Sequence, residues 1–332
     1  FYTNLTNTIL NQMYQKYCPK CKTPLTVPVF NREKSIRCKS CHYIGSKTNH
    51  TPLQNSKLPI WTFSYILRES VDYFPQVINA KTIQRKLGIA YNSSLLLKRR
   101  LQLFLKEFIE PIKIIMAEQA EESFPKGFRL PDTKTTDISD KIKGKAYIAS
   151  DTVALFSASQ RANGHRKRFR HTGQTASIYL SDLVAKEKGK YQIGTLIHTT
   201  AQNNGLVILD SVPNQKQETI QPLMDFLPTH VPMLTDEGYP WLSRYNFNHR
   251  AVNHSKRAKN GKRYVWGKDR WSCNGVHNQL AEGVQSAVKN SFKSGYKYFQ
   301  PKFSQLYLDE WCSLKAIKAV GIDRLIQVRR KK

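Results

Sequence analysis

The chain has 332 residues and carries 53 lysines and arginines against 24 aspartates and glutamates, a formal net charge of +29. The length predicts two or three domains. The charge runs along the whole chain and is too large for a merely solvated basic surface, so we expect a polyanionic partner, with nucleic acid the leading candidate. No apolar run approaches the roughly 18 residues of a spanning helix, and no signal peptide is visible. We therefore expect no membrane partner and a cytoplasmic location.

Four of the six cysteines form two close pairs near the N-terminus. Cys18 pairs with Cys21 and Cys38 with Cys41, with 16 residues between the pairs. Each pair supplies two thiolates from one tight turn, and two such turns close a tetrahedral site. The alternative, two disulfides, fits a basic and non-secreted chain poorly. The spacing predicts a zinc ribbon over residues 1–50 with one structural Zn²⁺, because four protein ligands leave no open position.

The segment 51–117 has apolar residues at helical spacing. It predicts a short helix that ends in a turn at Gly88, then a second helix from Leu95 to Phe108 capped by Asn92, Ser93 and Ser94. A helix, a glycine turn and a basic helix are typical of a helix-turn-helix, although many helical hairpins share this pattern. Beside a zinc ribbon and a charge of +29, the pattern favours DNA binding. The candidate DNA contacts are Lys98, Arg99 and Arg100.

The polar segment 118–144 is interpreted as a linker. After it come runs typical of strands, at 145–156, 175–184, 191–200, 205–211 and 231–237. Amphipathic helices are expected at 218–227 and 276–292. Together these elements predict an α/β domain over 145–320, in which helices flank a mixed sheet. The last residues, 321–332, are interpreted as a basic tail.

Three acids in this α/β segment form the candidate catalytic site. Asp151 lies within the first strand, Asp236 at the end of the run 231–237, and Glu282 on the polar face of the late helix. A carboxylate buried on a strand costs several kcal/mol unless it is paired or binds a metal. Three converging carboxylates would hold two divalent ions about 3.5–4 Å apart. Oxygen ligands suit Mg²⁺ or Mn²⁺.

Two other acids compete for places in this site. Asp210 heads a loop and is interpreted as a turn-forming residue. Glu237 points to the other face from Asp236 if the strand continues.

The order of these motifs resembles the DDE transposases of bacterial insertion sequences related to the eukaryotic Merlin elements. The resemblance covers about 18–310. It rests on the zinc ribbon and helix-turn-helix and on five later features: Asp151 after an apolar strand, Thr235–Tyr239, Val252–Ser255, His277–Gly283, and Lys289 seven residues after Glu282.

The resemblance implies an RNase H-like catalytic domain with Asp151, Asp236 and Glu282 as its metal-binding acids. It implies an enzyme that binds terminal inverted repeats in double-stranded DNA, nicks at the element ends and joins the 3′-hydroxyl ends to target DNA, using two Mg²⁺ or Mn²⁺ ions. It also implies a homodimer or higher oligomer in a synaptic complex, in the bacterial cytoplasm on the nucleoid. The further DNA-binding candidates are Lys289, His254, His277, Arg166, Lys167, Arg168 and Arg170.

The sequence departs from the family pattern at three positions. Thr152 stands where the family usually has a glutamate, Gln279 where it has an asparagine, and Gln285 where it has a tryptophan. None of these changes removes a carboxylate of the triad. Two alternatives stay open: a catalytically inactive, transposase-derived DNA-binding regulator, and a structure-specific RNase H-like nuclease.

Overall fold

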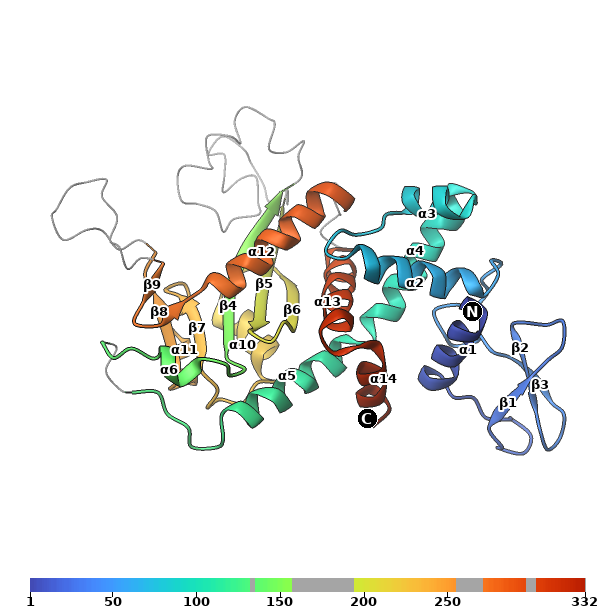
Figure 1. Ribbon diagram of the computed structural model, residues 1–332, viewed down its shortest axis with the longest axis horizontal. Coiled ribbons are helices and arrows are strands. Elements are labelled where there is room, and N and C mark those ends of the chain that lie inside the picture. The colour runs from blue at the N-terminus through green and yellow to red at the C-terminus, as the bar shows by residue number, and fades with distance from the viewer. Residues whose placement is uncertain (132–134, 157–193, 255–270, 297–302, 332) are drawn as a thin grey trace, which may run out of the picture.

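The computed structural model describes residues 1–131, 135–156, 194–254, 271–296 and 303–331 (Figure 1). The expected strand at 175–184 lies outside these residues.

The N-terminal region consists of one helix and a small sheet. Helix α1 (Tyr2–Met13) buries Ile9, Leu10 and Met13 against the helices that follow the sheet. Strands β1 (Leu25–Pro28), β2 (Ser35–Cys38) and β3 (Ile44–Ser46) form an antiparallel sheet in that order. Its own core is small: Cys18, Leu25, Ile36, Cys38 and the partly buried Tyr43. A core of this size does not stabilise a fold by itself, so the four cysteines must contribute.

Four helices follow: α2 (Trp61–Tyr73), α3 (Ala80–Leu87), α4 (Tyr91–Lys106) and α5 (Ile109–Ser123). Asn79 caps α3 by accepting a hydrogen bond from the Thr82 amide at 3.0 Å. Gly88 ends this helix at φ +63°, a left-handed conformation that glycine adopts without a steric penalty.

The second helix of the predicted pair begins earlier than expected. Helix α4 starts at Tyr91 rather than Leu95, so the residues taken for its cap lie in its first turn. The Ser94 hydroxyl donates to the Ala90 carbonyl at 3.1 Å, which is a bond within the helix and not a cap. Serine and asparagine in a first turn resemble a cap in the sequence, which explains the shift.

Five strands form the main sheet: β4 (Ile148–Phe156), β5 (Gly194–Gln202), β6 (Val207–Val212), β7 (Met233–Asp236) and β8 (His249–Val252). Their order is β6-β5-β4-β7-β8. The pairs β4–β5 and β5–β6 are antiparallel, whereas β4–β7 and β7–β8 are parallel. This mixed sheet flanked by helices confirms the predicted RNase H-like α/β architecture.

Both faces of the sheet are covered (Figure 1). On one face, α12 (Gln279–Ser291) and α13 (Ser304–Val320) pack Val284, Val288, Leu308 and Trp311 against strand residues such as Ile197 and Leu209. The other face joins a larger core that contains α10 (Gln217–Met224) and α5. The smaller elements are α6 (Ser139–Ile142), α11 (Leu242–Tyr245), β9 (Ser272–Cys273), β10 (Val276–His277) and a π-helix (Phe292–Tyr296).

Residues 322–331, expected as part of a tail, form helix α14 (Ile322–Lys331). Leu325, Ile326 and Val328 are buried in the main core. The Arg329 guanidinium contacts the Glu107 carboxylate and donates to the Met13 carbonyl at 2.6 Å. The basic residues thus alternate with apolar ones that fix this helix against the fold. Within the described residues, no helix combines the length and the apolar character that crossing a membrane requires.

A buried ion pair joins α4 to α13. The Lys98 ammonium contacts the Glu310 carboxylate, and both side chains are almost fully buried. Gln102 and Tyr296 also donate to Glu310, at 2.8 and 2.9 Å. Burial lowers the pKa of Lys98, and the Glu310 carboxylate opposes this shift. The Lys98 ammonium therefore stays charged in the core only while the Glu310 carboxylate lies beside it.

We expect Glu310→Gln to lower the free energy of unfolding by about 3–5 kcal/mol, because it leaves the Lys98 ammonium buried without an anion. The double variant Lys98→Met, Glu310→Gln removes both charges and should recover most of this loss. Denaturant unfolding of the wild type, both single variants and the double variant gives the coupling directly. Additive single effects would contradict this account of the pair.

Candidate active site

The sheet places Asp151 and Asp236 on neighbouring strands. Strands β4 and β7 pair in parallel from Ile148 opposite Met233 to Ser150 opposite Thr235. The next residue on each strand is the acid. Asp236 ends β7, and Asp151 continues in β4. The two carboxylates therefore lie side by side at the point where this pairing stops.

Glu282 reaches the same place from helix α12, which packs across β4 and β5. Burial raises the pKa of Asp151 to about 7, and the charges of Asp236 and Glu282 add to this rise. The Thr152 amide opposes the rise by donating to Asp151 Oδ1 at 2.7 Å. The structure thus brings Asp236 and Glu282 close enough to Asp151 for their charges to raise its pKa.

The three acids are less tightly grouped than the four cysteines. In the described part of the chain, the cysteines alone form a set of three or more potential metal ligands within 4.8 Å of one another. On α12 and at its N-terminus, the Gln285 amide nitrogen and both polar atoms of the Asn278 side chain are buried without a hydrogen-bond partner. Repelling carboxylates and unsatisfied amides fit a site that accepts a divalent cation together with oxygen ligands.

Part of the predicted polar face of α12 is turned inward. Asn278 and Gln285 are 1% and 5% exposed, whereas the Glu282 side chain on the same face is 39% exposed. The Gln285 side chain lies near enough to Asp151 to lower the pKa of that carboxyl, although its nitrogen completes no hydrogen bond. Lys289 is partly buried on the same helix, about 10 Å along the axis from Glu282.

The two candidate histidines make different contacts near the start of α12. His254 Nε2 is 3.5 Å from Glu282 Oε1, and its ring is 5.0 Å from the ring of Trp271. His277 packs its ring 6.1 Å from that of Tyr147, and burial lowers its pKa. His254 thus contacts a candidate metal ligand, whereas His277 lies in a separate aromatic contact.

The prediction that Lys98 contacts DNA is wrong. Its ammonium is buried against Glu310 and cannot reach a phosphate while this ion pair is formed. Its basic neighbours also have internal partners. Arg99 donates to Gln102 and Tyr307, and Arg100 donates to the Pro52 and Gln54 carbonyls. The sequence did not reveal the burial of Lys98, because helix α13, which covers it, lies about 200 residues further along the chain. The remaining predicted contacts, Arg166, Lys167, Arg168 and Arg170, lie outside the described residues.

The two competing acids lie elsewhere. Asp210 is opposite His198 in the β5–β6 pairing, whereas Asp151 is opposite Thr199. Asp210 therefore belongs to the row of side chains on the other face of the sheet. Glu237 is exposed just past the end of β7. Neither position brings its carboxylate into the group around Asp151.

Sequence reasoning missed a buried polar network behind the acids. It contains His198, Tyr239, Thr152 and Ser150. A histidine inside the apolar run of β5 was the available signal. Its partners could not be identified from the sequence, because they come from two separate segments, β4 and the turn after β7.

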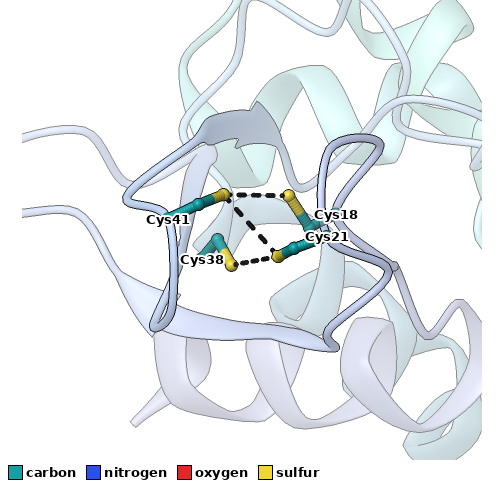
Figure 2. A group of neighbouring side chains, drawn as sticks. All are labelled: Cys18, Cys21, Cys38 and Cys41. Carbon is teal, nitrogen blue, oxygen red and sulfur yellow. Dashed lines mark hydrogen bonds between the residues drawn. The ribbon is translucent and has the colours of Figure 1, made fainter.

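The four cysteines converge at the open end of the small sheet (Figure 2). The sulfur of Cys18 is 3.4 Å from that of Cys41, and the sulfur of Cys21 is 3.4 Å from Cys38 and 3.6 Å from Cys41. Disulfide bonding would require about 2.05 Å. A tetrahedral Zn²⁺ with bonds of about 2.3 Å places sulfurs about 3.8 Å apart. The cluster therefore fits a zinc ribbon and not a pair of disulfides.

The turns of the two cysteine pairs match. Lys22 and His42, each one residue after a pair, have φ of +59°. The Cys18 and Cys38 amides donate to the Thr23 and Tyr43 carbonyls, both at 2.8 Å. This repeated turn directs both thiols of a pair toward one point.

The raised pKa of Asp151 predicts a pH-dependent stability without divalent metal. The unfolded chain releases this proton near pH 4 and the folded chain near pH 7, so stability falls between these values and the full cost applies above pH 7. Asp151→Asn removes this charge and should raise the free energy of unfolding above pH 7 by up to roughly 4 kcal/mol. In Mg²⁺-free buffer, thermal unfolding should show the variant more stable at pH 8 and little changed at pH 4. An equal dependence of stability on pH in the wild type and in Asp151→Asn would contradict this prediction.

An RNase H-like sheet with three converging carboxylates defines a candidate nuclease or strand-transfer enzyme. Residues 133–312, just over half of the chain, match the family model of the ISXO2-like transposase domain. The chain therefore belongs to this transposase family, which supports an insertion-sequence DDE transposase. No curated protein and no solved structure matches the chain.

Proposed function

We propose that the protein is the DNA transposase of an insertion sequence that cuts at element ends and joins them to target DNA. The observation that supports this most directly is the grouping of Asp151, Asp236 and Glu282 at the point where the pairing of β4 with β7 ends, inside the region matched to the transposase family. The net charge of +29 suits a DNA partner.

In this proposal the three acids hold two Mg²⁺ or Mn²⁺ ions. Such ions activate the attacking oxygen and stabilise the leaving oxygen of a phosphodiester. His254 orients Glu282, and Lys289 binds a phosphate near the site. In the first step water attacks phosphorus and the 3′-oxygen at the element end leaves. In the second step that 3′-hydroxyl attacks a target phosphodiester and releases the target 3′-oxygen.

We further propose that different parts of the chain bind DNA and catalyse the reaction. The ribbon at 1–50 and the helices at 51–117 bind the terminal inverted repeats, while 145–320 carries out the chemistry. Because Lys98 is buried, the exposed residues of α3 and of the start of α4 are better placed to meet DNA. These include Lys81, Arg85, Tyr91 and Asn92. Pairing two ends requires a dimer or larger assembly, which acts on bacterial DNA in the cytoplasm.

The test is a strand-transfer assay with a labelled duplex that carries the element end, a supercoiled target plasmid and Mn²⁺. We expect cleavage at the element boundary and label joined covalently to the plasmid. Tight binding without cleavage in Mg²⁺ or Mn²⁺ would instead favour the inactive regulator. Cutting of branched DNA with no joined product would favour the structure-specific nuclease.

A further inference from the structure

The backbone pairing between β4 and β7 ends just before the two acids that repel each other. The last pair is Ser150 opposite Thr235, so no β4–β7 pair joins the residues beyond it. Asp151 still pairs with Thr199 of β5, and Asp236 pairs with Val252 of β8, so each acid is held by a different neighbouring strand. A contact that joins the two segments directly would add to the control of their spacing.

The Tyr239 side chain makes such a contact. Tyr239 follows Asp236 by three residues, and its side chain is 1% exposed. Its hydroxyl contacts Thr152 Oγ1, on the residue next to Asp151. Each end of this link thus lies within three residues of one acid. The link closes a short loop from one carboxylate to the other.

The turn that carries Tyr239 is itself fixed by Asp236. The Gly238 amide donates to Asp236 Oδ1 at 2.9 Å. A Cβ atom at position 238 would stand 2.9 Å from the same oxygen, so a side chain there would displace the Asp236 carboxylate from this position. The orientation of the Asp236 carboxylate is therefore coupled to the path of the chain toward Tyr239.

His198 holds the other side of this link. It is fully buried on β5, and its Nδ1 lies 3.3 Å from the Tyr239 hydroxyl. Its Nε2 lies 3.2 Å from Ser150 Oγ and 3.4 Å from Thr200 Oγ1. Burial lowers the pKa of His198 to about 3, so the ring is neutral, with one nitrogen that donates and one that accepts.

The network and the candidate metal site lie on opposite faces of β4. Ser150 and Thr152 flank Asp151, and side chains alternate along a strand, so both hydroxyls point away from the acid. The network thus does not touch substrate or metal. It can act only by fixing the backbone that carries the carboxylates.

We propose that the hydroxyl–imidazole network of Thr152, Tyr239 and His198 is a positioning device that holds Asp151 and Asp236 at the spacing required for divalent-metal binding. This proposal rests on the proposed function. It also gives a role to Thr152, where the sequence departs from the usual glutamate of the family pattern: its hydroxyl receives the Tyr239 link.

The test uses the zinc-loaded full chain with Tyr239→Phe and Thr152→Val, which remove one end of the link each and keep the side-chain volume. Mn²⁺ affinity is measured by calorimetry, with Asp236→Asn to identify the binding that belongs to the acids. We expect each variant to bind Mn²⁺ about 10–100-fold more weakly. Cleavage should fall at low Mn²⁺ and recover as Mn²⁺ is raised.

Tyr245→Phe is the matched control, because the Tyr245 hydroxyl donates to Asp225 at 2.6 Å, outside the network. It should change neither Mn²⁺ affinity nor cleavage. Unchanged Mn²⁺ affinity in both network variants would overturn this proposal alone, as would lost cleavage that no Mn²⁺ concentration restores. A wild type that binds no Mn²⁺ at the acids would overturn the proposed function and this proposal with it.

Discussion

Asp151→Asn and Asp236→Asn should each reduce strand cleavage by about 10³-fold or more, while leaving affinity for element-end DNA unchanged. Asparagine keeps the size of the side chain but removes the charge that would hold the metal ions. Loss of one member of a group that acts as a unit removes most of the catalysis. Cleavage is measured under single-turnover conditions in Mg²⁺ and in Mn²⁺, and binding by a gel-shift assay with the same duplex.

The chain offers matched controls for this prediction in its two competing acids. Asp210→Asn and Glu237→Gln remove equal charges from the other face of the sheet and from an exposed position beyond β7. Both should keep cleavage within a few-fold of the wild type. If Asp210→Asn abolished cleavage while Asp151→Asn did not, the assignment of the triad would be wrong.

Removal of zinc should have the largest effect on stability. Structural zinc sites contribute about 10–16 kcal/mol of apparent binding free energy, and this energy is available to folding. The small sheet that carries Cys18 and Cys38 has a core of only a few side chains. Cys38→Ser, or treatment with a chelator, should therefore unfold residues 18–46 and weaken DNA binding at least about tenfold.

Hydrogen exchange can locate this effect. Amides of β1 to β3 should lose protection, whereas those of β4 and β5 should keep it, because the main sheet has a separate core. Cys273→Ser is the control, since Cys273 lies outside the four-cysteine cluster. A Cys38→Ser chain that keeps bound zinc and a protected ribbon would rule out the four-cysteine site.

Local signals in the sequence were sufficient for much of the fold and the candidate site. The spacing of the cysteines depends only on two short turns, and the structure brings all four sulfurs together. Apolar runs located the strands around Asp151 and Asp236, because a buried strand needs such a run whatever its neighbours are. The amphipathic pattern likewise located the helix that carries Glu282.

The features that the sequence could not predict depend on contacts between distant segments. From the sequence, Lys98 was predicted to be an exposed basic residue, but in the structure α13 buries it beside Glu310. Residues 322–331 were predicted as a tail because their many charged residues drew attention away from the apolar residues on one side of helix α14. The link from Tyr239 to Thr152 joins residues 87 positions apart. Such contacts follow from the tertiary arrangement of the helices and strands, which no local pattern contains.

The most direct test of the central claim is strand cleavage of a labelled duplex carrying the element's own end, with the wild type and Glu282→Gln compared side by side in Mg²⁺ and Mn²⁺. We expect metal-dependent cutting at the element boundary by the wild type and none by the variant, with equal DNA binding by both. Cutting by Glu282→Gln at the wild-type rate, or tight binding without cutting by the wild type in either metal, would contradict the account.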